Sequence, residues 1–523
     1  MPRPSPLPPA LAGIASVALG AGAGELLAGL FAPASSPFAV VGGAIIDLAP
    51  SWAKDTAIAL FGTSDKIALL VGIGLVAVIL AAGAGWLEAR KAPWGRVVVA
   101  AFGIGGAFVA ATRAGATEAA WFPAALAGAI GAIAIGFLAR SANRSQVSPA
   151  PAEGEGGPAD PVEGGPADPD RRRFFVWAGV TTATGLVLAI AGGAVRAGAQ
   201  AVTAARDALR LPAPAVAAPP VPAAAELGID GLAPVVTPNG EFYRIDTALV
   251  VPQVAASDWS LRIHGMVEQE VTLTWDELVA LPLEESITTL TCVSNEVGGD
   301  LIGNALWLGY PIRELLARAR PTADADMVLS RSIDGFTASS PIEALTDERN
   351  AILAVGMNGE PLPTEHGFPV RMVVPGLYGY VSATKWVTEL EVTRFDAATS
   401  YWTDRGWSER GPIKLESRID VPRRSTSVAA GDTVIAGVAW QQHVGVAGVE
   451  VKVDDGDWQQ ATLATGISDD TWVQWSVPWA AEPGSHRLTC RATNVDGETQ
   501  TPDEANVVPD GATGWHSVEV TVR

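Results

Sequence analysis

The residues best suited to redox chemistry are few and lie in the second half of the chain. Cys292 lies in TTLTCVSNEVGG, at the end of a β-like run and close to Asn295 and a glycine pair, whereas Cys490 lies within a strand pattern. In an oxidising compartment the two could form a disulfide; the competing interpretation is an inert core Cys490 and a soft metal ligand at Cys292. No His or carboxylate cluster surrounds Cys292 in the sequence. Because one thiolate cannot hold a metal alone, a cofactor would have to supply the other ligands.

A second group of residues has the chemistry of an anion-binding site. Arg371, Lys385 and His366 would supply cationic and N–H donors to a phosphate. The glycines of PGLYGY (375–380) would let the backbone approach a bulky cofactor. Taken singly, either cation could be a surface charge and His366 a turn residue, so only the joint pattern favours a site.

Several ordered segments resemble the sulfite oxidase family of molybdopterin enzymes, and together they cover roughly residues 235–523. The segments are TPNGEFYRID (237–246), TTLTCVSN (288–295), ALWLGYPIREL (305–315), NGEPLPTEHGFPVRMVVPGLYGYVSATKW (358–386) and YWTDRGWSERGPIKLESRIDVPR (401–423). The fourth segment is long and specific, whereas the isolated CxxN pattern is weak. The resemblance implies an α+β molybdopterin domain followed by an immunoglobulin-like dimerisation domain.

The resemblance also implies roles for individual residues. Cys292 would ligate molybdenum beside the pterin dithiolene, Arg244 would lie near both pterin and substrate oxyanion, and Trp307 would line the substrate pocket. The implied catalytic residues are Arg244, Cys292, Trp307 and Trp407, and the implied cofactor-binding residues are Tyr243, Arg244, Asn295, His366, Arg371, Ser382 and Lys385.

Three departures from the family pattern bear on the substrate. Ser294-Asn295-Glu296-Val297 replaces a Gly-Asn-Arg-Arg run, so an arginine expected to bind sulfite is missing. The catalytic tyrosine position holds Trp407, and the histidine expected just after Arg244 is Asp246. The candidates to restore the lost positive charge are Arg405, Arg410 and Arg418.

The implied chemistry is oxygen-atom transfer on a small oxyanion or oxide substrate, with Arg244 and neighbouring cations stabilising developing negative charge. The first candidate reaction is sulfite to sulfate, with electrons passing to an external acceptor. One alternative is a reductase of S- or N-oxides such as methionine sulfoxide. Another is a non-catalytic membrane receptor that retains the fold.

Charge and hydropathy divide the chain into two parts. The chain has 523 residues and a formal net charge of −21, yet residues 1–200 carry +1 and residues 201–523 carry −22. The mean hydropathy is +0.25. This asymmetry favours a membrane part joined to a water-exposed part. It excludes one soluble globule, a disordered chain and a nucleic-acid binder that works by bulk charge.

Apolar runs near 8–32, 67–87, 97–112 and 119–139, and a fifth over 176–195, approach the length that spans a bilayer. Residues 38–62 contain charges and Pro50, so we expect an interfacial or re-entrant piece there. We therefore expect transmembrane helices over 1–145, a disordered linker over 146–170, a fifth transmembrane helix over 171–200, an Ala/Pro-rich linker over 201–240, a molybdopterin-binding domain over 241–395 and an immunoglobulin-like dimerisation domain over 396–523.

The orientation follows from Lys and Arg in the short loops. One cluster follows the second run, and another, which includes RRRFF (171–175), lies between the fourth and fifth runs, so both are expected inside. The acidic part would then be extracytoplasmic. RRRFF resembles a twin-arginine export signal, although a plain positive stop before a span is an equal alternative.

Local sequence patterns predict several strands and helices within residues 201–523. LRIHGMV and VTLTW predict strands, DELVAL predicts a short helix capped by Asp276, and PIRELLARAR (311–320) predicts a helix that begins near Pro311. From about residue 396 onward helical periodicity is absent, and strand patterns recur with turn clusters between them: VIAGVAW, VEVKVD, WVQWSVPW, HRLTCRAT and HSVEVTV.

The partners follow from what the membrane part lacks. Residues 1–250 contain no histidine and the chain contains no CxxCH motif, so we expect no haem. Electrons would pass to an external partner such as a c-type cytochrome. The negative charge of residues 201–523 would attract a partner with a basic surface. A homodimer is implied by the resemblance alone.

Overall fold

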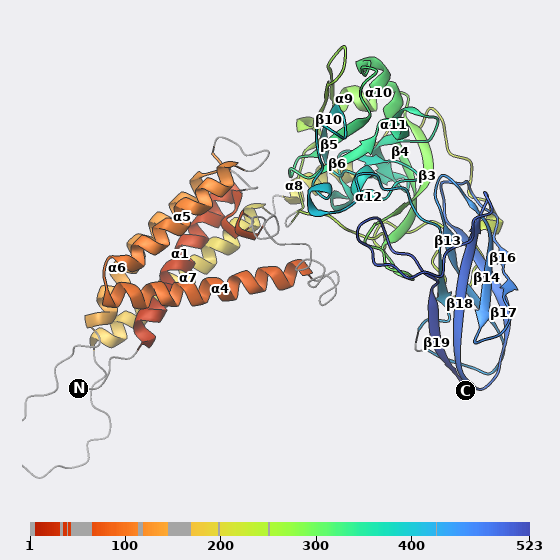
Figure 1. Ribbon diagram of the computed structural model, residues 1–523. Helices are drawn as coiled ribbons and strands as arrows, with labels where there is room; N and C mark the ends of the chain where they lie inside the picture. Colours follow the sequence, from red (N-terminus) through yellow and green to blue (C-terminus); the bar gives the residue numbers. More distant parts are fainter. Residues whose placement is uncertain are drawn as a thin grey trace, which may run out of the picture. The chain divides into compact units, whose positions relative to one another are not determined.

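The computed structural model describes residues 6–31, 35–38, 40–42, 65–112, 119–144, 169–196, 199–248, 251–424 and 426–523. These residues form two compact units (Figure 1): Met1–Ala201 with Ala248–Val250, and Val202–Thr247 with Val251–Arg523. Most of the expected interfacial piece (38–62) and of the expected linker (146–170) lies outside the described residues.

The first unit is built from five long apolar helices. They are α1 (Leu7–Phe31), α4 (Asp65–Arg90), α5 (Trp94–Thr112), α6 (Phe122–Arg144) and α7 (Pro169–Arg196). Each is long and apolar enough to cross a membrane. The five apolar runs of the sequence are therefore confirmed as helices.

Small residues let these helices approach closely. A Cβ atom added at Gly13 of α1 would lie 1.9 Å from the carbonyl oxygen of Ala81 in α4, and one at Gly103 of α5 would lie 2.5 Å from Cα of Gly128 in α6. Backbone-to-backbone packing of this kind is how helices associate where no hydrophobic effect drives them together.

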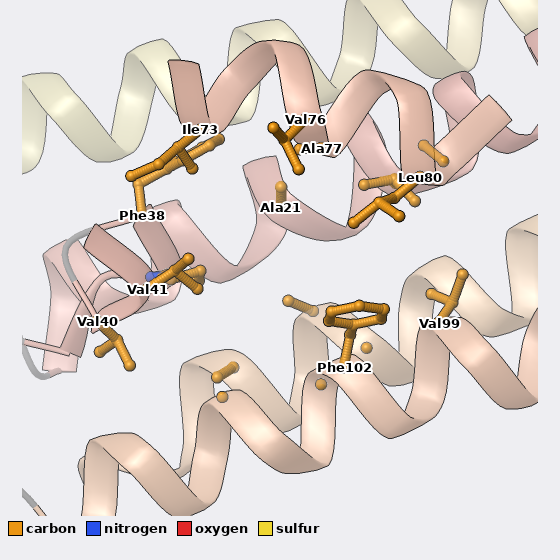
Figure 2. Close-up of a pocket in the computed structure, with 18 of the residues that line it drawn as sticks. Ala21, Phe38, Val40, Val41, Ile73, Val76, Ala77, Leu80, Val99 and Phe102 are labelled. Atoms are coloured by element: carbon orange, nitrogen blue, oxygen red, sulfur yellow. The ribbon is translucent and has the colours of Figure 1, made fainter. Parts of the chain in front are cut away.

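A large apolar cavity lies among α1, α4, α5 and α6 (Figure 2). Its volume is about 730 Å³, and Phe38 and Val41 line it together with side chains such as Leu80 and Phe102. One turn beyond the cavity, the buried Glu88 of α4 accepts hydrogen bonds from Nε (2.8 Å) and Nη2 (2.6 Å) of Arg96 in α5. A paired charge of this kind is the form in which a buried carboxylate is tolerated.

The second unit begins with a segment that lies along its surface. We define the strap as residues 202–247, which contain most of α8 (Ala199–Ala208) and the short 3-10 helix η3 (Ala223–Ala225). The Val235 carbonyl accepts from Asn304 Nδ2 (2.7 Å) and from Trp472 Nε1 (2.9 Å). The strap, most of which was expected to be a linker, therefore joins two distant parts of this unit.

Two sheets form the part of the unit that precedes residue 400. The first has the order β2-β1-β10-β5-β6, in which only β1 and β10 are parallel. Its strands are β1 (Ser260–Gly265), β2 (Val271–Thr274), β5 (Met327–Ser332), β6 (Thr337–Pro341) and β10 (Val387–Thr393). The second has the order β3-β4-β7-β8, and β9 pairs with β7. Its strands are β3 (Glu284–Thr291), β4 (Ile302–Pro311), β7 (Ile352–Met357), β8 (Glu360–Pro361) and β9 (Arg371–Val373).

Short helices cover these sheets. They are η4 (Ala256–Asp258), α9 (Trp275–Val279), α10 (Ile312–Ala319), α11 (Glu343–Thr346), η5 (Thr364–His366), α12 (Gly379–Ser382) and η6 (Thr403–Arg405). The expected helix at Pro311 is confirmed as α10, which has Pro311 as its N-cap. The expected cap of α9 at Asp276 is wrong: Thr274 and Glu277 form a capping box, because β2 runs to Thr274 and the helix starts at the next residue.

The C-terminal part is a sandwich of two sheets around one apolar core. One sheet has the order β11-β13-β17-β16 and the other β12-β19-β18-β14-β15. The strands are β11 (Glu416–Val421), β12 (Ser427–Val428), β13 (Gly431–Trp440), β14 (Val446–Val453), β15 (Gln459–Gln460), β16 (Thr462–Leu463), β17 (Val473–Ala481), β18 (Gly484–Asn494) and β19 (Ser517–Val522). All five strand patterns expected beyond residue 396 are confirmed.

Candidate active site

Cys292 lines a cavity of about 120 Å³. The described residues that line it come from the strap, the Cys292 loop and three later segments: Phe242, Tyr243, Ile245, Asp246, Thr247, Cys292, Val293, Ser294, Ser332, Asp334, Phe336, His366, Arg371, Gly379, Tyr380, Ala383, Lys385, Trp386, Trp402 and Trp407. Six of the residues predicted from the sequence are among them: Tyr243, Cys292, His366, Arg371, Lys385 and Trp407.

Cys292 is held at the start of a tight loop after β3. Its N–H donates to the Leu301 carbonyl (2.9 Å), and its sulfur accepts from the Ser294 N–H (3.4 Å). Burial raises the pKa of the thiol. Cys292 and Cys490 are both free, so the disulfide alternative is wrong. Cys490 lies in the sandwich core instead.

The sandwich supports this loop from behind. A Cβ atom at Gly298 (φ +77°) would lie 2.1 Å from the ring of His516, so only glycine fits there. The His516 Nδ1 atom accepts from the Ile419 N–H (2.9 Å), and the Gly299 carbonyl accepts from Arg418 Nη1 (2.7 Å). The position of the thiol therefore depends on residues more than 100 positions away in the chain.

Three basic side chains gather on one wall of the cavity because a glycine permits their close approach. Gly367 has a φ of +110°, and a Cβ atom there would lie 3.0 Å from the Arg371 Cβ and 3.1 Å from the Lys385 Cβ. This turn ends η5, which carries His366. The Arg371 guanidinium lies 5.1 Å from the ring centroid of Trp307 and donates to the carbonyl of His366 (3.2 Å).

Burial is the main cause of the pKa shifts of all three groups. The pKa of His366 falls to about 4, mainly through burial and then through the nearby Arg371. The pKa of Lys385 falls to about 8 because of burial, although Asp246 opposes the change, and burial lowers that of Arg371 to about 10. At neutral pH the wall therefore holds two cations and a neutral imidazole.

Aromatic side chains close the rest of the cavity. Trp407 lies 5.9 Å from Tyr380 and 6.0 Å from Trp402, measured between ring centroids. Tyr243 stacks on Phe242 at 5.3 Å, and burial raises the pKa of its phenol. Such a wall excludes water and strengthens electrostatic interactions inside.

Four predicted residues do not line the cavity. Trp307 is completely buried, contrary to the expectation that it lines a substrate pocket, because its Nε1 donates to the Thr288 carbonyl and its ring packs behind Arg371. The Ser382 hydroxyl donates to the carbonyls of Leu377 and Tyr378.

Arg244 and Asn295, the other two, lie beside the cavity. Arg244 is 38% exposed and donates from Nε to Asp246 Oδ2 (2.9 Å). Asn295 accepts from the Leu301 N–H (2.9 Å), and its buried Nδ2 has no hydrogen-bond partner within the described residues.

None of the three candidate replacement arginines lines the cavity among the described residues. Arg405 Nη1 donates to the Tyr401 carbonyl, Arg410 pairs with Glu343, and Arg418 pairs with Asp420. The charge lost after the cysteine is therefore not restored by them.

Several lining residues were missed from the sequence, notably Phe336, Tyr380, Trp386 and Trp402. Trp402 lies five residues before Trp407 within the quoted YWTDRGW segment, and that pairing of aromatics could have identified it. Phe336 follows a β-turn and carries no such signal.

The donor set fits a molybdenum–pterin cofactor that carries a phosphate. A soft thiol lines the same cavity as two buried cations, and an unpartnered amide donor, Asn295 Nδ2, lies three residues from that thiol. No group of three or more His, Cys, Asp or Glu side chains within the described residues could hold a metal ion. The further metal ligands would therefore come from the cofactor.

Comparison with known proteins agrees with this assignment. The family described as "Oxidoreductase molybdopterin binding domain" matches residues 248–402, which include Cys292, His366, Arg371 and Lys385. Mitochondrial sulfite oxidase of Rattus norvegicus is 28% identical over 349 residues, covering 55% of this chain and 62% of the rat protein. The chain thus spans less than two thirds of the length of that relative.

Two further proteins resemble this chain over different shares of its length. The uncharacterized oxidoreductase YuiH of Bacillus subtilis is 31% identical over 153 residues, which are 29% of this chain and 74% of YuiH. The sulfane dehydrogenase SoxCD of Paracoccus pantotrophus aligns with a TM-score of 0.48 at 22% identity, over 56% of this chain and 82% of that one. From the matched domain and its curated relatives, the chain belongs to the sulfite oxidase family of molybdopterin-binding oxidoreductases.

Proposed function

We propose that this protein is a membrane-anchored, extracytoplasmic molybdenum-cofactor oxidoreductase that carries out oxygen-atom transfer on a small substrate. The observation that carries the proposal is the single cavity that Cys292 shares with Arg371, Lys385 and His366. When bound, a molybdenum–pterin group supplies two-electron oxygen-atom chemistry.

The residues of this chain have separate roles in the proposed site. Cys292 would hold the metal, and because burial raises the pKa of its thiol, the metal must displace a proton there. Arg371, Lys385 and the neutral His366 would bind the phosphate and pterin. Arg244 would lie nearest the substrate, while Trp402, Trp407 and Tyr380 exclude water from it.

Loading requires some movement of the lining. The cavity measures about 120 Å³, below the roughly 300–1,000 Å³ typical of ligand pockets. We therefore expect lining side chains to separate when the cofactor enters.

Two substrate classes are candidates. Sulfite, with electrons leaving to an external acceptor, is the first, because the curated relatives include sulfite oxidases. Reduction of S- or N-oxides is the second. The observation that favours it is the loss of anion-binding charge, since Arg405, Arg410 and Arg418 all have partners elsewhere.

Metal analysis of purified protein from a host that makes the cofactor tests the proposal. We expect about one molybdenum per chain, and its absence would contradict an enzyme and favour a receptor. Assays with sulfite plus cytochrome c, run beside assays with a reduced dye plus a sulfoxide, then decide the substrate class and direction.

The membrane assignment rests on the five apolar helices and on the distribution of basic residues. Arg90 ends α4 and Lys91 follows it, whereas Arg140 and Arg144 lie at the end of α6 and Arg171–Arg173 at the start of α7. Placing both clusters inside puts the second unit outside. An alkaline phosphatase fused after Arg523 should be active, and an inactive fusion would contradict this orientation.

The proposed electron acceptor is a separate protein such as a c-type cytochrome, and the sandwich is a proposed homodimer contact. The net charge of −22 over residues 201–523 would attract a basic acceptor. The rate of cytochrome reduction should therefore fall as ionic strength rises.

A further inference from the structure

The cationic wall of the cavity contains its own counter-anion. Asp246 lines the cavity with a side chain that is only 4% exposed. Its Oδ2 atom accepts from Lys385 Nζ at 2.7 Å and from Arg244 Nε at 2.9 Å. One carboxylate oxygen is therefore shared by two of the cations that the site was expected to offer.

The third cation is held differently. Arg371 donates to the carbonyls of Met372, His366 and Ala383, and no ion pair of its guanidinium is found among the described residues. Its positive charge is buried and uncompensated, so it remains available to a phosphate.

Of the two described carboxylates that line the cavity, only Asp246 pairs with cations, because Asp334 accepts from the Phe336 N–H instead. Arg371 and Lys385 are the cations and Asp246 and Asp334 are the carboxylates among the described lining residues. His366 is neutral above about pH 4. Once a cofactor uses Arg371 and Lys385, Arg244 is the cation left near a substrate, and its Nε already donates to Asp246. Transferring an oxyanion from water into such a site is unfavourable, whereas a neutral oxide needs only hydrogen-bond donors.

We propose that Asp246 is a specificity-determining residue which, by holding Lys385 and Arg244, makes the site select neutral S- or N-oxides over oxyanions such as sulfite. This inference rests on the proposed oxygen-atom transfer function and decides between its two substrate classes. Asp246 acts through the two cations that it holds, and it makes no chemical step itself.

The test compares three variants of the full-length protein. Asp246→Asn keeps the size of the side chain and removes its charge, while Asp246→Glu keeps the charge. Asp334→Asn is the matched control, because Asp334 also lines the cavity but accepts from the Phe336 N–H rather than from a cation.

The first readout is sulfate binding measured by isothermal titration calorimetry, which needs no turnover. We expect Asp246→Asn to lower the Kd for sulfate at least tenfold, and Asp246→Glu and Asp334→Asn to leave it within about twofold of the wild-type value. The second readout is the ratio of kcat/KM for dimethyl sulfoxide to that for sulfite, which should fall at least tenfold in Asp246→Asn alone.

Two results would overturn the inference: an unchanged sulfate Kd in folded Asp246→Asn protein, or an equal gain in Asp334→Asn. Molybdenum content is measured on every sample. A wild-type protein without molybdenum contradicts the proposed function, whereas normal molybdenum with unaltered sulfate binding in Asp246→Asn contradicts only the role of Asp246.

Discussion

The backbone N–H of Ser294 donates a hydrogen bond to the sulfur of Cys292 over 3.4 Å. This contact favours the thiolate, but burial dominates and raises the pKa of the thiol. The thiol is therefore protonated in the protein without metal. Binding a metal at Cys292 should release that proton, so the apparent metal affinity should rise with pH.

Replacing Cys292 by serine should abolish molybdenum binding and leave the fold intact, because a serine hydroxyl is a poor ligand for a soft metal site. Mass-spectrometric metal analysis should show less than a tenth of the wild-type molybdenum. Cys490→Ser is the matched control, since Cys490 is also buried but lies in the sandwich core. Molybdenum retained in Cys292→Ser, or lost in both variants, would contradict the assignment.

Arg371→Met should reduce cofactor content at least tenfold while leaving the free energy of unfolding of the cofactor-free protein unchanged or higher. The reason is that Arg371 is a buried cation without a carboxylate partner among the described residues, so removing its charge removes a desolvation penalty. Pterin fluorescence after extraction and thermal unfolding measure the two effects. Arg331→Met, which alters a partly exposed pair with Glu389, should not change pterin content.

His516 should make the protein less stable in mild acid. Burial lowers its pKa from 6.5 to about 4. Between these values the unfolded chain binds a proton that the folded protein does not, so stability is fully present above about pH 6.5 and is lost as pH falls towards about 4. Thermal unfolding scans from pH 4 to 7 should show a shallower acid loss in His516→Gln. The exposed His443→Gln is the control, and an identical slope in wild type and His516→Gln would refute this role.

Glu416 should have the opposite effect. Burial raises the pKa of its carboxyl group from 4.5 to about 8, against the influence of Lys414 and Arg418. The folded protein keeps a proton that the unfolded chain releases above about pH 4.5, so this contribution to stability is lost as pH rises towards about 8. Glu416→Gln should be the more stable protein at pH 8 and should differ little at pH 4.5. Equal unfolding temperatures at pH 8 would contradict the prediction.

Local sequence patterns predicted helices and strands correctly where the hydrophobic periodicity and the capping residues indicated the same element. The helix α10 after Pro311 and the five sandwich strands follow directly from their sequences. The cap of α9 was misplaced because Asp276 and Thr274 are both good N-cap residues, and only the end of β2 decides between them.

The candidate site was predictable in composition but not in arrangement. Cys292, Arg371 and Lys385 could be selected from their motifs, and the structure brings them to one cavity. That Trp307 packs behind Arg371, and that Asp246 joins Lys385 to Arg244, depends on side-chain directions across separate segments. One-dimensional spacing does not contain those directions.

The Val235 carbonyl, which Asn304 and Trp472 share as an acceptor, has a consequence for modularity. Suppose that the catalytic part of the chain were fused to a different membrane anchor. If the fused part began at residue 248, where the matched domain starts, Val235 would be missing. Asn304 Nδ2 and Trp472 Nε1 would then be buried without that acceptor. The smallest part that can be transferred to a new anchor therefore includes the strap. A fusion that preserves the enzyme must join the new anchor upstream of residue 202.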